Sequence, residues 1–163
     1  PTKEDFAWGF RTGFITFGCK GLSDAQYEAL VKKLMAAIRS SVSCAATPSQ
    51  SLILKAASDG KLEEEKAEFR KILERRYKLV RDFVSTHESK FIKPLPFNSG
   101  YFMSFDTMSI DAEKLRQKLL NDRGIGTISI DVKTLRVAFS SLDEEKINIV
   151  YQAIYDIADE LGK

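Results

Sequence analysis

The sequence predicts an α+β fold, in which helices pack on a small and mostly antiparallel sheet. Most strand-like segments lie in the second half of the chain, after Pro94 and Pro96, whereas apolar stripes at helical spacing occur in both halves. Strands and helices do not alternate in the regular βαβ order of a parallel sheet. The chain has 163 residues, of which 44% are hydrophobic, so it is long and apolar enough to bury a core.

A buried strand is predicted near the start of the chain. Residues 6–17 are rich in aromatic side chains, and residues 13–17 (Gly-Phe-Ile-Thr-Phe) form an apolar run that Gly18 and Gly21 bound. A short apolar run between turn-forming glycines is typical of a strand that is buried on both faces.

Two helices are predicted to follow this strand. Ser23 is a typical N-cap for the first, which should end near Ser41. Pro48 suits the first turn of the second helix, and Asp59-Gly60 is a typical end for it. The first helix carries one apolar stripe, made of Tyr27, Leu30, Val31, Leu34 and Ile38.

The rest of the chain should form a long helix and then the sheet with its covering helices. The long helix is expected over residues 61–88, with a buried face made of Phe69, Ile72, Leu73, Val80, Phe83 and Val84. Strands are expected at residues 101–106, 125–130 and 134–140, with a tight turn near residues 131–133. Helices are expected from Ile110-Asp111, with Leu115 and Leu119 inward, and over residues 143–161, with Ile147, Val150, Ile154, Ile157 and Leu161 on one face.

Charge and cysteine content narrow the classes of function. The 25 positive and 23 negative side chains give a net charge of +2, without the basic stripe of a dedicated nucleic-acid or membrane binder. No apolar run is long enough to span a bilayer. Cys19 and Cys44 have neither a metal-ligand spacing nor a disulfide framework, so free thiols in a reducing cytoplasm are expected.

Because the chain starts without Met, inside an expected element, we expect a longer parent protein.

The first candidate site is a lysine followed by a glycine-flanked arginine. Five residues separate Lys3 from the segment Gly9-Phe10-Arg11-Thr12-Gly13. Glycines allow a ligand or another backbone to approach closely. An arginine that enters a buried strand needs an anion, because a lone buried charge is costly. A phosphate would satisfy it by accepting two parallel hydrogen bonds.

This pattern resembles the cofactor-lysine motif of class I and II aminotransferases, which use pyridoxal 5'-phosphate (PLP) and have the aspartate aminotransferase fold. The resemblance implies that Lys3 forms the Schiff base with PLP and moves a proton between the substrate α-carbon and the cofactor as general base and acid. It also implies that Arg11 binds the PLP phosphate, with help from the hydroxyl of Thr2. Glu4-Asp5 is less usual directly after such a lysine.

The second candidate is Arg136, in the segment Thr-Leu-Arg-Val-Ala-Phe-Ser at residues 134–140. Strand alternation places Arg136 on the same face as the small residues Ala138 and Ser140, opposite Leu135, Val137 and Phe139. The pattern alone fits a surface arginine on a half-exposed strand. The segment also resembles the family's clamp for the substrate α-carboxylate, which implies that Arg136 binds that group through its planar guanidinium.

Two further features bear on the candidate site. Residues 98–102 (Asn-Ser-Gly-Tyr-Phe) resemble a family segment that opens the first small-domain strand near the substrate, and they also fit an ordinary turn. His87 is the one histidine, so a histidine-based hydrolase triad or histidine-rich metal site lacks partners, and no metal is expected.

The resemblance implies a domain organisation and a reaction. Residues 1–22 would end the large PLP-binding domain, residues 23–60 would be connecting helices, and residues 61–163 would form the C-terminal small domain. The full-length protein would transfer an amino group between an amino acid and a 2-oxo acid as a homodimer. The acid at the pyridine nitrogen, the ring-stacking aromatic, and the tyrosine and asparagine at the cofactor oxygen would precede residue 1. The chain alone is therefore expected to be inactive and to bind PLP weakly.

Three alternatives remain open from the sequence. The same fold could support another PLP reaction, such as a carbon-sulfur lyase or a decarboxylase. It could also serve a non-catalytic PLP-binding transcription regulator with a DNA-binding domain before residue 1. In the third alternative, Lys3 and Arg11 are incidental. The side-chain preference for the substrate is not predicted.

Overall fold

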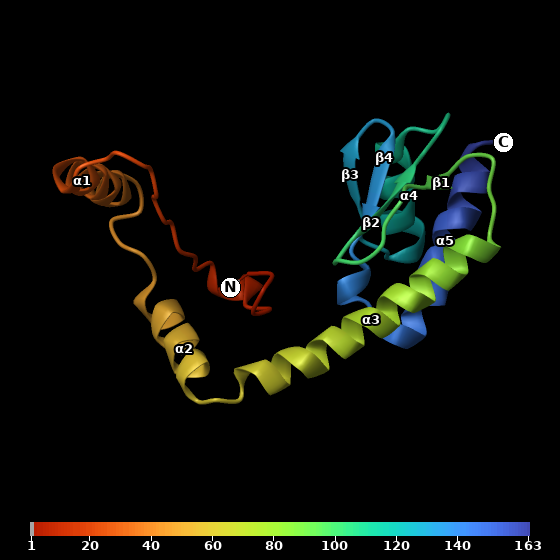
Figure 1. Ribbon diagram of the computed structural model, residues 1–163. Coiled ribbons are helices and arrows are strands. Elements are labelled where there is room, and N and C mark those ends of the chain that lie inside the picture. The colour runs from red at the N-terminus through yellow and green to blue at the C-terminus, as the bar shows by residue number, and fades with distance from the viewer. Residues whose placement is uncertain (1) are drawn as a thin grey trace. The chain divides into compact units, whose positions relative to one another are not determined.

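The computed structural model describes residues 2–163, and these residues form two compact units with their boundary between Ala67 and Glu68. The boundary falls inside helix α3 (Leu62–Thr86), which matches the long helix predicted over residues 61–88. Figure 1 shows the α-helices and the sheet along the chain.

The second unit contains a small antiparallel sheet, as predicted, but the sheet has four strands where the sequence predicts three. Its strands are β1 (Lys93–Pro94), β2 (Met103–Asp106), β3 (Ile128–Asp131) and β4 (Thr134–Val137). They lie in the order β1-β2-β4-β3, with every neighbouring pair antiparallel. β4 is therefore a central strand and can make ladder hydrogen bonds on both of its sides.

The end of β4 differs from the prediction. The sequence predicts a strand to Ser140, but β4 ends at Val137 and is followed by the 3-10 helix η2 (Phe139–Ser141). The backbone turns there because the N–H of Ser141 donates to the carbonyl of Ala138, and the N–H of Ser140 donates to the carbonyl of Tyr101. A strand prediction from alternation does not detect such a turn, because Phe139 stays buried in either conformation.

Helices α4 (Ala112–Arg123) and α5 (Glu144–Leu161) pack against each other, and α4 also contacts β3 and β4 (Figure 1). Local signals define the ends of α4. The Asp111 carboxylate accepts hydrogen bonds from the N–H groups of Glu113 and Lys114. Gly124 follows the helix at φ 65°, the left-handed conformation that glycine adopts without steric cost.

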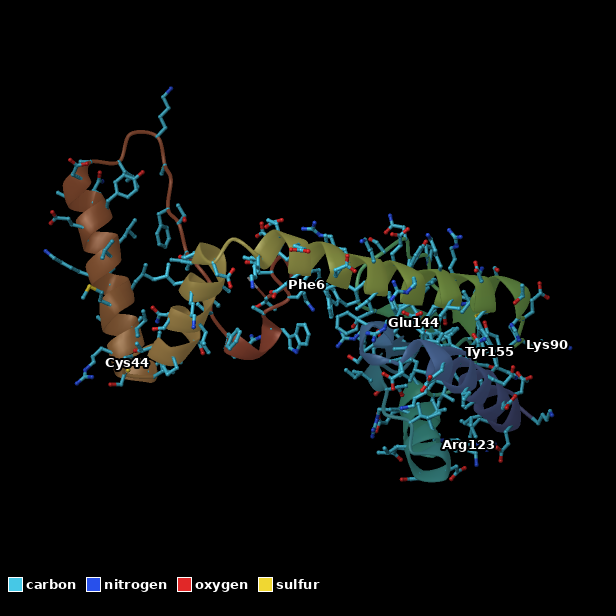
Figure 2. The ribbon with its side chains drawn as sticks, turned by 90° about the horizontal axis from the view of Figure 1, so that it is seen from below. Phe6, Cys44, Lys90, Arg123, Glu144 and Tyr155 are labelled. Carbon is cyan, nitrogen blue, oxygen red and sulfur yellow. The ribbon has the colours of Figure 1, made fainter. Side chains whose placement is uncertain are left out.

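The apolar core of the second unit lies between α5, α4, α3 and the sheet. Phe105 and Leu135 from the sheet, and Tyr151 and Ile154 from α5, are fully buried. α3 contributes Val80 and Phe83, two of the six residues predicted for its buried face. Burying a side chain of this size stabilises a fold by about 1.5–3 kcal/mol. Figure 2 shows Tyr155 between α5 and α3. The centroid of its ring lies 5.9 Å from that of the Phe83 ring.

The first unit contains the 3-10 helix η1 (Trp8–Phe10), α1 (Asp24–Ser41), α2 (Thr47–Ser58) and the first residues of α3. Both predicted helices are confirmed. A capping box starts α1, in which the N–H of Ser23 donates to Gln26 Oε1 at 2.8 Å. Pro48 lies in the first turn of α2, and Gly60 follows that helix at φ 76°.

The strand predicted at residues 13–17 is wrong for this structure. Residues 11–19 have no regular secondary structure, and Phe14 is 85% exposed. A strand requires a partner for its ladder, and the four strands of the sheet all lie between residues 93 and 137. The apolar stripe of α1 is also not buried, because Val31 and Ile38 are exposed.

A carboxylate on α4 links this helix to the sheet. Glu113 accepts hydrogen bonds from Arg116 Nε at 2.7 Å, from Gln117 Nε2 at 2.9 Å and from Ser129 Oγ on β3 at 2.5 Å. The Arg116 side chain, followed by Ser129 and Gln117, lowers the pKa of Glu113 to about 2 from its ordinary value of 4.5. The charged form is therefore the one that the fold stabilises.

Glu113 should make the second unit sensitive to acid. Because its pKa is lower in the folded chain than in the unfolded chain, its contribution is fully present above about pH 4.5 and is lost as the pH falls toward about 2. The unfolding free energy can be measured with urea at several pH values between about 4.5 and 2. It should fall less steeply with decreasing pH for Glu113→Gln than for the unaltered chain. Glu88→Gln, at an exposed glutamate, is the matched control. Parallel curves for Glu113→Gln and the unaltered chain would contradict the assignment.

Candidate functional site

The four candidate residues lie in two different units. Thr2 and Lys3 are in the turn that precedes η1, and Arg11 directly follows η1, so these three belong to the first unit. Arg136 is on β4 in the second unit. The two sets are therefore built by different parts of the chain.

Arg11 is held in an unusual backbone conformation. It caps η1 at φ 50° and ψ 36°, in the left-handed region, and its Nη1 donates to the carbonyl of Trp8 at 3.1 Å. A non-glycine residue in this region costs about 1–3 kcal/mol and persists where its surroundings fix it. The side chain is exposed, so the guanidinium can meet a ligand.

Arg11 lines a cavity of about 870 Å³ within the first unit. Apolar side chains dominate its wall, with a few polar groups that include Arg11, Thr12 and Gln50. Ligand sites in proteins are typically concave and apolar, with a volume of about 300–1,000 Å³ and a few convergent polar groups. The remaining lining residues are Asp5, Phe10, Gly13, Phe14, Val42, Cys44, Ala45, Ala46, Ile53, Leu54 and Ala57.

The residues of this unit fit the chemistry of a phosphorylated aldehyde cofactor. Lys3 is exposed and offers a primary amine, which can condense with an aldehyde. Arg11 offers a planar guanidinium, which suits a phosphate. The two groups stand on consecutive parts of one segment, the turn at residues 2–4 and the end of η1.

Arg136 presents an unsatisfied guanidinium nitrogen on the face of the sheet opposite the core. Its neighbours across the two ladders are Ser104 on β2 and Ile128 on β3. Its Nε is buried and has no hydrogen-bond partner among residues 2–163. A buried donor without a partner is costly, and a carboxylate would satisfy it.

An aromatic ring supports the Arg136 side chain. Cζ of Arg136 lies 4.8 Å from the centroid of the Phe102 ring, within the range of a cation–π contact. Phe102 belongs to the segment at residues 98–102, for which the sequence left the choice between a substrate segment and a turn open. Phe102 and Ser104 are two positions apart, so alternation could have placed the ring on the Arg136 face.

The turn after β4 is fixed from two directions. Arg76 on α3 donates from Nη1 to the carbonyl of Ser140, and the N–H of Ser140 donates to the carbonyl of Tyr101. These bonds join the end of β4 to α3 and to the residue next to Phe102. The sequence did not single out Arg76, because α3 carries many charged residues with the same spacing.

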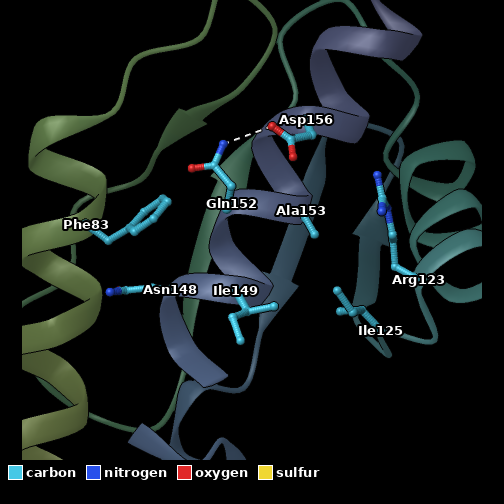
Figure 3. A pocket seen from close by; sticks show the side chains of 8 residues that line it. All are labelled: Phe83, Arg123, Ile125, Asn148, Ile149, Gln152, Ala153 and Asp156. Atoms are coloured by element: carbon cyan, nitrogen blue, oxygen red, sulfur yellow. Dashed lines mark hydrogen bonds between the residues drawn. The ribbon is translucent and has the colours of Figure 1, made fainter. Parts of the chain in front are cut away.

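A second cavity, of about 540 Å³, lies at α5 and contains none of the four candidates (Figure 3). Asn148, Gln152 and Asp156 form a polar row on α5, with Arg123 at the end of α4, and Gln152 donates to Asp156 at 2.9 Å. Among residues 2–163, no three metal-ligating side chains gather, and no helix is long and apolar enough to cross a membrane.

Comparison with known proteins identifies the family. The sequence model of the family described as aminotransferase class I and II matches residues 6–154. Arg11 and Arg136 lie inside the matched region, whereas Thr2 and Lys3 precede it. No curated protein sequence matches the chain significantly.

Solved structures share the fold. The kynurenine aminotransferase of Pyrococcus horikoshii has a TM-score of 0.71 at 19% identity, over 83% of this chain and 35% of its own. For LysN, the α-aminoadipate aminotransferase of Thermus thermophilus, the TM-score is 0.70 at 17% identity, over 82% of this chain and 36% of LysN. For an aminotransferase of Anaerococcus prevotii, the TM-score is 0.65 at 22% identity, over 86% of this chain and 33% of that protein.

These matches confirm the predicted α+β fold class and the resemblance found in the sequence. The chain spans about a third of the length of the matched structures. With 149 consecutive positions (residues 6–154) matched by the family's sequence model, the chain belongs to the class I and II aminotransferases.

Proposed function

We propose that this chain is part of a PLP-dependent aminotransferase, which transfers an amino group between an amino acid and a 2-oxo acid. Membership of the family supports this reaction. The observation that carries the proposal is the buried, unsatisfied Nε of Arg136, on the face of the sheet opposite the core. A matched structure was solved with PMP, and LysN was solved with N-(5'-phosphopyridoxyl)-L-leucine, a cofactor–amino acid adduct.

Arg136 would bind the α-carboxylate of the amino acid. A guanidinium can donate two parallel hydrogen bonds to a carboxylate, and this geometry fixes the plane of the carboxylate and the position of the neighbouring α-carbon. Phe102 holds one face of the guanidinium, so the donors are aimed along the plane of the group. Ser104 and Ile128 flank it on the two neighbouring strands.

Lys3 would hold the cofactor through its amine and would then act as general base and acid. Once released by the substrate, the amine can remove the α-proton and return a proton at the cofactor carbon. PLP, when bound, supplies the electron sink that accepts the charge left at the α-carbon. Arg11, with the hydroxyl of Thr2, would bind the phosphate and so fix the cofactor relative to Lys3.

The proposed roles match a proposed division of the chain. Residues 1–22 would be the end of the large cofactor-binding domain, residues 23–60 would connect the domains, and residues 61–163 would form the small domain with Arg136. Since the chain spans about a third of the matched structures, each test below uses the full-length protein.

Removing the amine of Lys3 should abolish covalent cofactor binding. Full-length protein mixed with PLP should give a visible absorbance band that shifts when an amino acid is added, and borohydride should trap the cofactor on Lys3. Lys3→Ala should lose both signals, because the variant lacks the amine that forms the adduct. Lys20→Ala, at an exposed lysine of the same unit, is the control and should keep both. A normal band in Lys3→Ala would contradict the assignment.

Replacing the guanidinium of Arg136 should weaken the use of amino acid substrates. We expect Arg136→Lys to lower kcat/KM by about tenfold to a hundredfold, the equivalent of one or two charge-assisted hydrogen bonds. Steady-state transamination kinetics measure this change, and the visible cofactor band should remain. Arg123→Lys, at the second cavity, is the matched control. An unchanged kcat/KM in Arg136→Lys would show that another group binds the carboxylate.

We also propose that the full-length protein is a homodimer in the cytoplasm. Exposed aromatic side chains in the first unit support association, and they include Trp8, Phe10, Phe14 and Phe17. The two exposed free thiols, Cys19 and Cys44, suit a reducing compartment. Sedimentation of the full-length protein should give twice the protomer mass, and a stable monomer would exclude the dimer.

A further inference from the structure

A lysine is the one residue that the first unit buries among residues 2–67. Lys66 is 7% exposed, whereas every other described residue of this unit is at least partly exposed. Its ammonium donates to Glu63 Oε1 at 2.8 Å and to Asp5 Oδ1 at 3.0 Å. A buried ammonium is stable only with such partners, so the two carboxylates are essential to its position.

The bond to Asp5 joins two distant parts of the sequence. Glu63 is three residues from Lys66 on the same helix, but Asp5 is 61 positions away, in the segment before η1. Asp5 is two residues after Lys3 and also lines the cavity that contains Arg11. Phe6, the next residue, has φ 53° in the left-handed region. The backbone next to Lys3 is therefore in a conformation that needs support from outside the segment.

We infer that Lys66 is a positioning residue for Lys3, because its ion pair with Asp5 anchors the segment that carries the cofactor-binding amine. The inference rests on the proposed function, since it assigns a purpose to the placement of that amine. It also explains Asp5, an unusual residue directly downstream of such a lysine. Lys66 touches neither cofactor nor substrate in this role and acts through Asp5.

Burial separates this ion pair from the other lysine pairs along α3. Lys71 donates to Glu68 at 2.7 Å, but these side chains are 62% and 66% exposed, so water and salt weaken their attraction. The Lys66 side chain is 8% exposed and that of Asp5 is 24% exposed. The Lys66–Asp5 pair, which is less exposed to water, is therefore better able to restrain a backbone segment than the surface pairs.

The test measures how selectively PLP reacts with Lys3 in the full-length protein. PLP is added, the adduct is trapped with borohydride, and peptide mapping gives the ratio of labelled Lys3 to labelled Lys20. Lys66→Met removes the anchoring bond and Asp5→Asn removes its negative charge, and each should lower this ratio by about tenfold, the effect of one charge-assisted hydrogen bond. Lys66→Arg keeps the positive charge and should give a ratio of labelled Lys3 to labelled Lys20 close to that of the unaltered protein. Lys71→Met is the matched surface control and should match the unaltered protein.

A second measurement separates anchoring from general loss of structure. Amide hydrogen exchange at residues 2–6 should become faster in Lys66→Met and Asp5→Asn, while exchange in α1 and α2 stays unchanged. Selective labelling of Lys3 that is equal in all variants would overturn this inference and leave the proposed function intact. No selective labelling of Lys3 in the unaltered protein would overturn the proposed function together with this inference.

Discussion

The second unit depends on the apolar core that side chains of α5 share with those of the sheet. Tyr151 and Ile154 on α5 pack with Phe105 on β2 and Leu135 on β4, and all four are fully buried. Since strand side chains alternate between two faces, burying Leu135 forces Arg136 onto the opposite face. The apolar core thus places the guanidinium on the face opposite the core, against the Phe102 ring. A slip of one residue in β4 would bury the charge and expose the core residues, so the register is strongly constrained.

The first unit depends on a different kind of interaction. No apolar side chain is buried among residues 2–67, and the one buried residue is Lys66, whose ammonium donates to Glu63 and Asp5. A charge cluster is directional, because it requires particular donors and acceptors, whereas apolar burial is not. Such an interaction suits the role proposed for this segment, which is to hold the amine of Lys3 in place. Aromatic side chains near η1, such as Trp8, Phe10 and Phe14, are exposed, and exposed apolar side chains favour association.

The two units contribute different chemistry to the proposed reaction. The first supplies an amine and a guanidinium on one short segment, Lys3 and Arg11, which suit an aldehyde and a phosphate. The second supplies a guanidinium on a rigid central strand, Arg136, which suits a carboxylate. A strand flanked on both sides is a more precise support than a loop. The turn after β4, fixed by Arg76, extends that rigidity beyond the last ladder bond.

The sequence alone determined what depends on neighbouring residues. Ser23, Pro48 and Asp111 act within a turn of their own helices, so α1, α2 and α4 could be predicted within a few residues. Alternation alone placed Arg136 opposite Leu135 and Val137.

Features that depend on partners distant in the sequence follow from the tertiary structure. Residues 13–17 have the composition of a strand but no described strand pairs with them, and a strand cannot form without its ladder. The stacking of Arg136 on Phe102 and the pairing of Lys66 with Asp5 join positions far apart in the chain, and alternation gives a side chain's face but not the partner across from it.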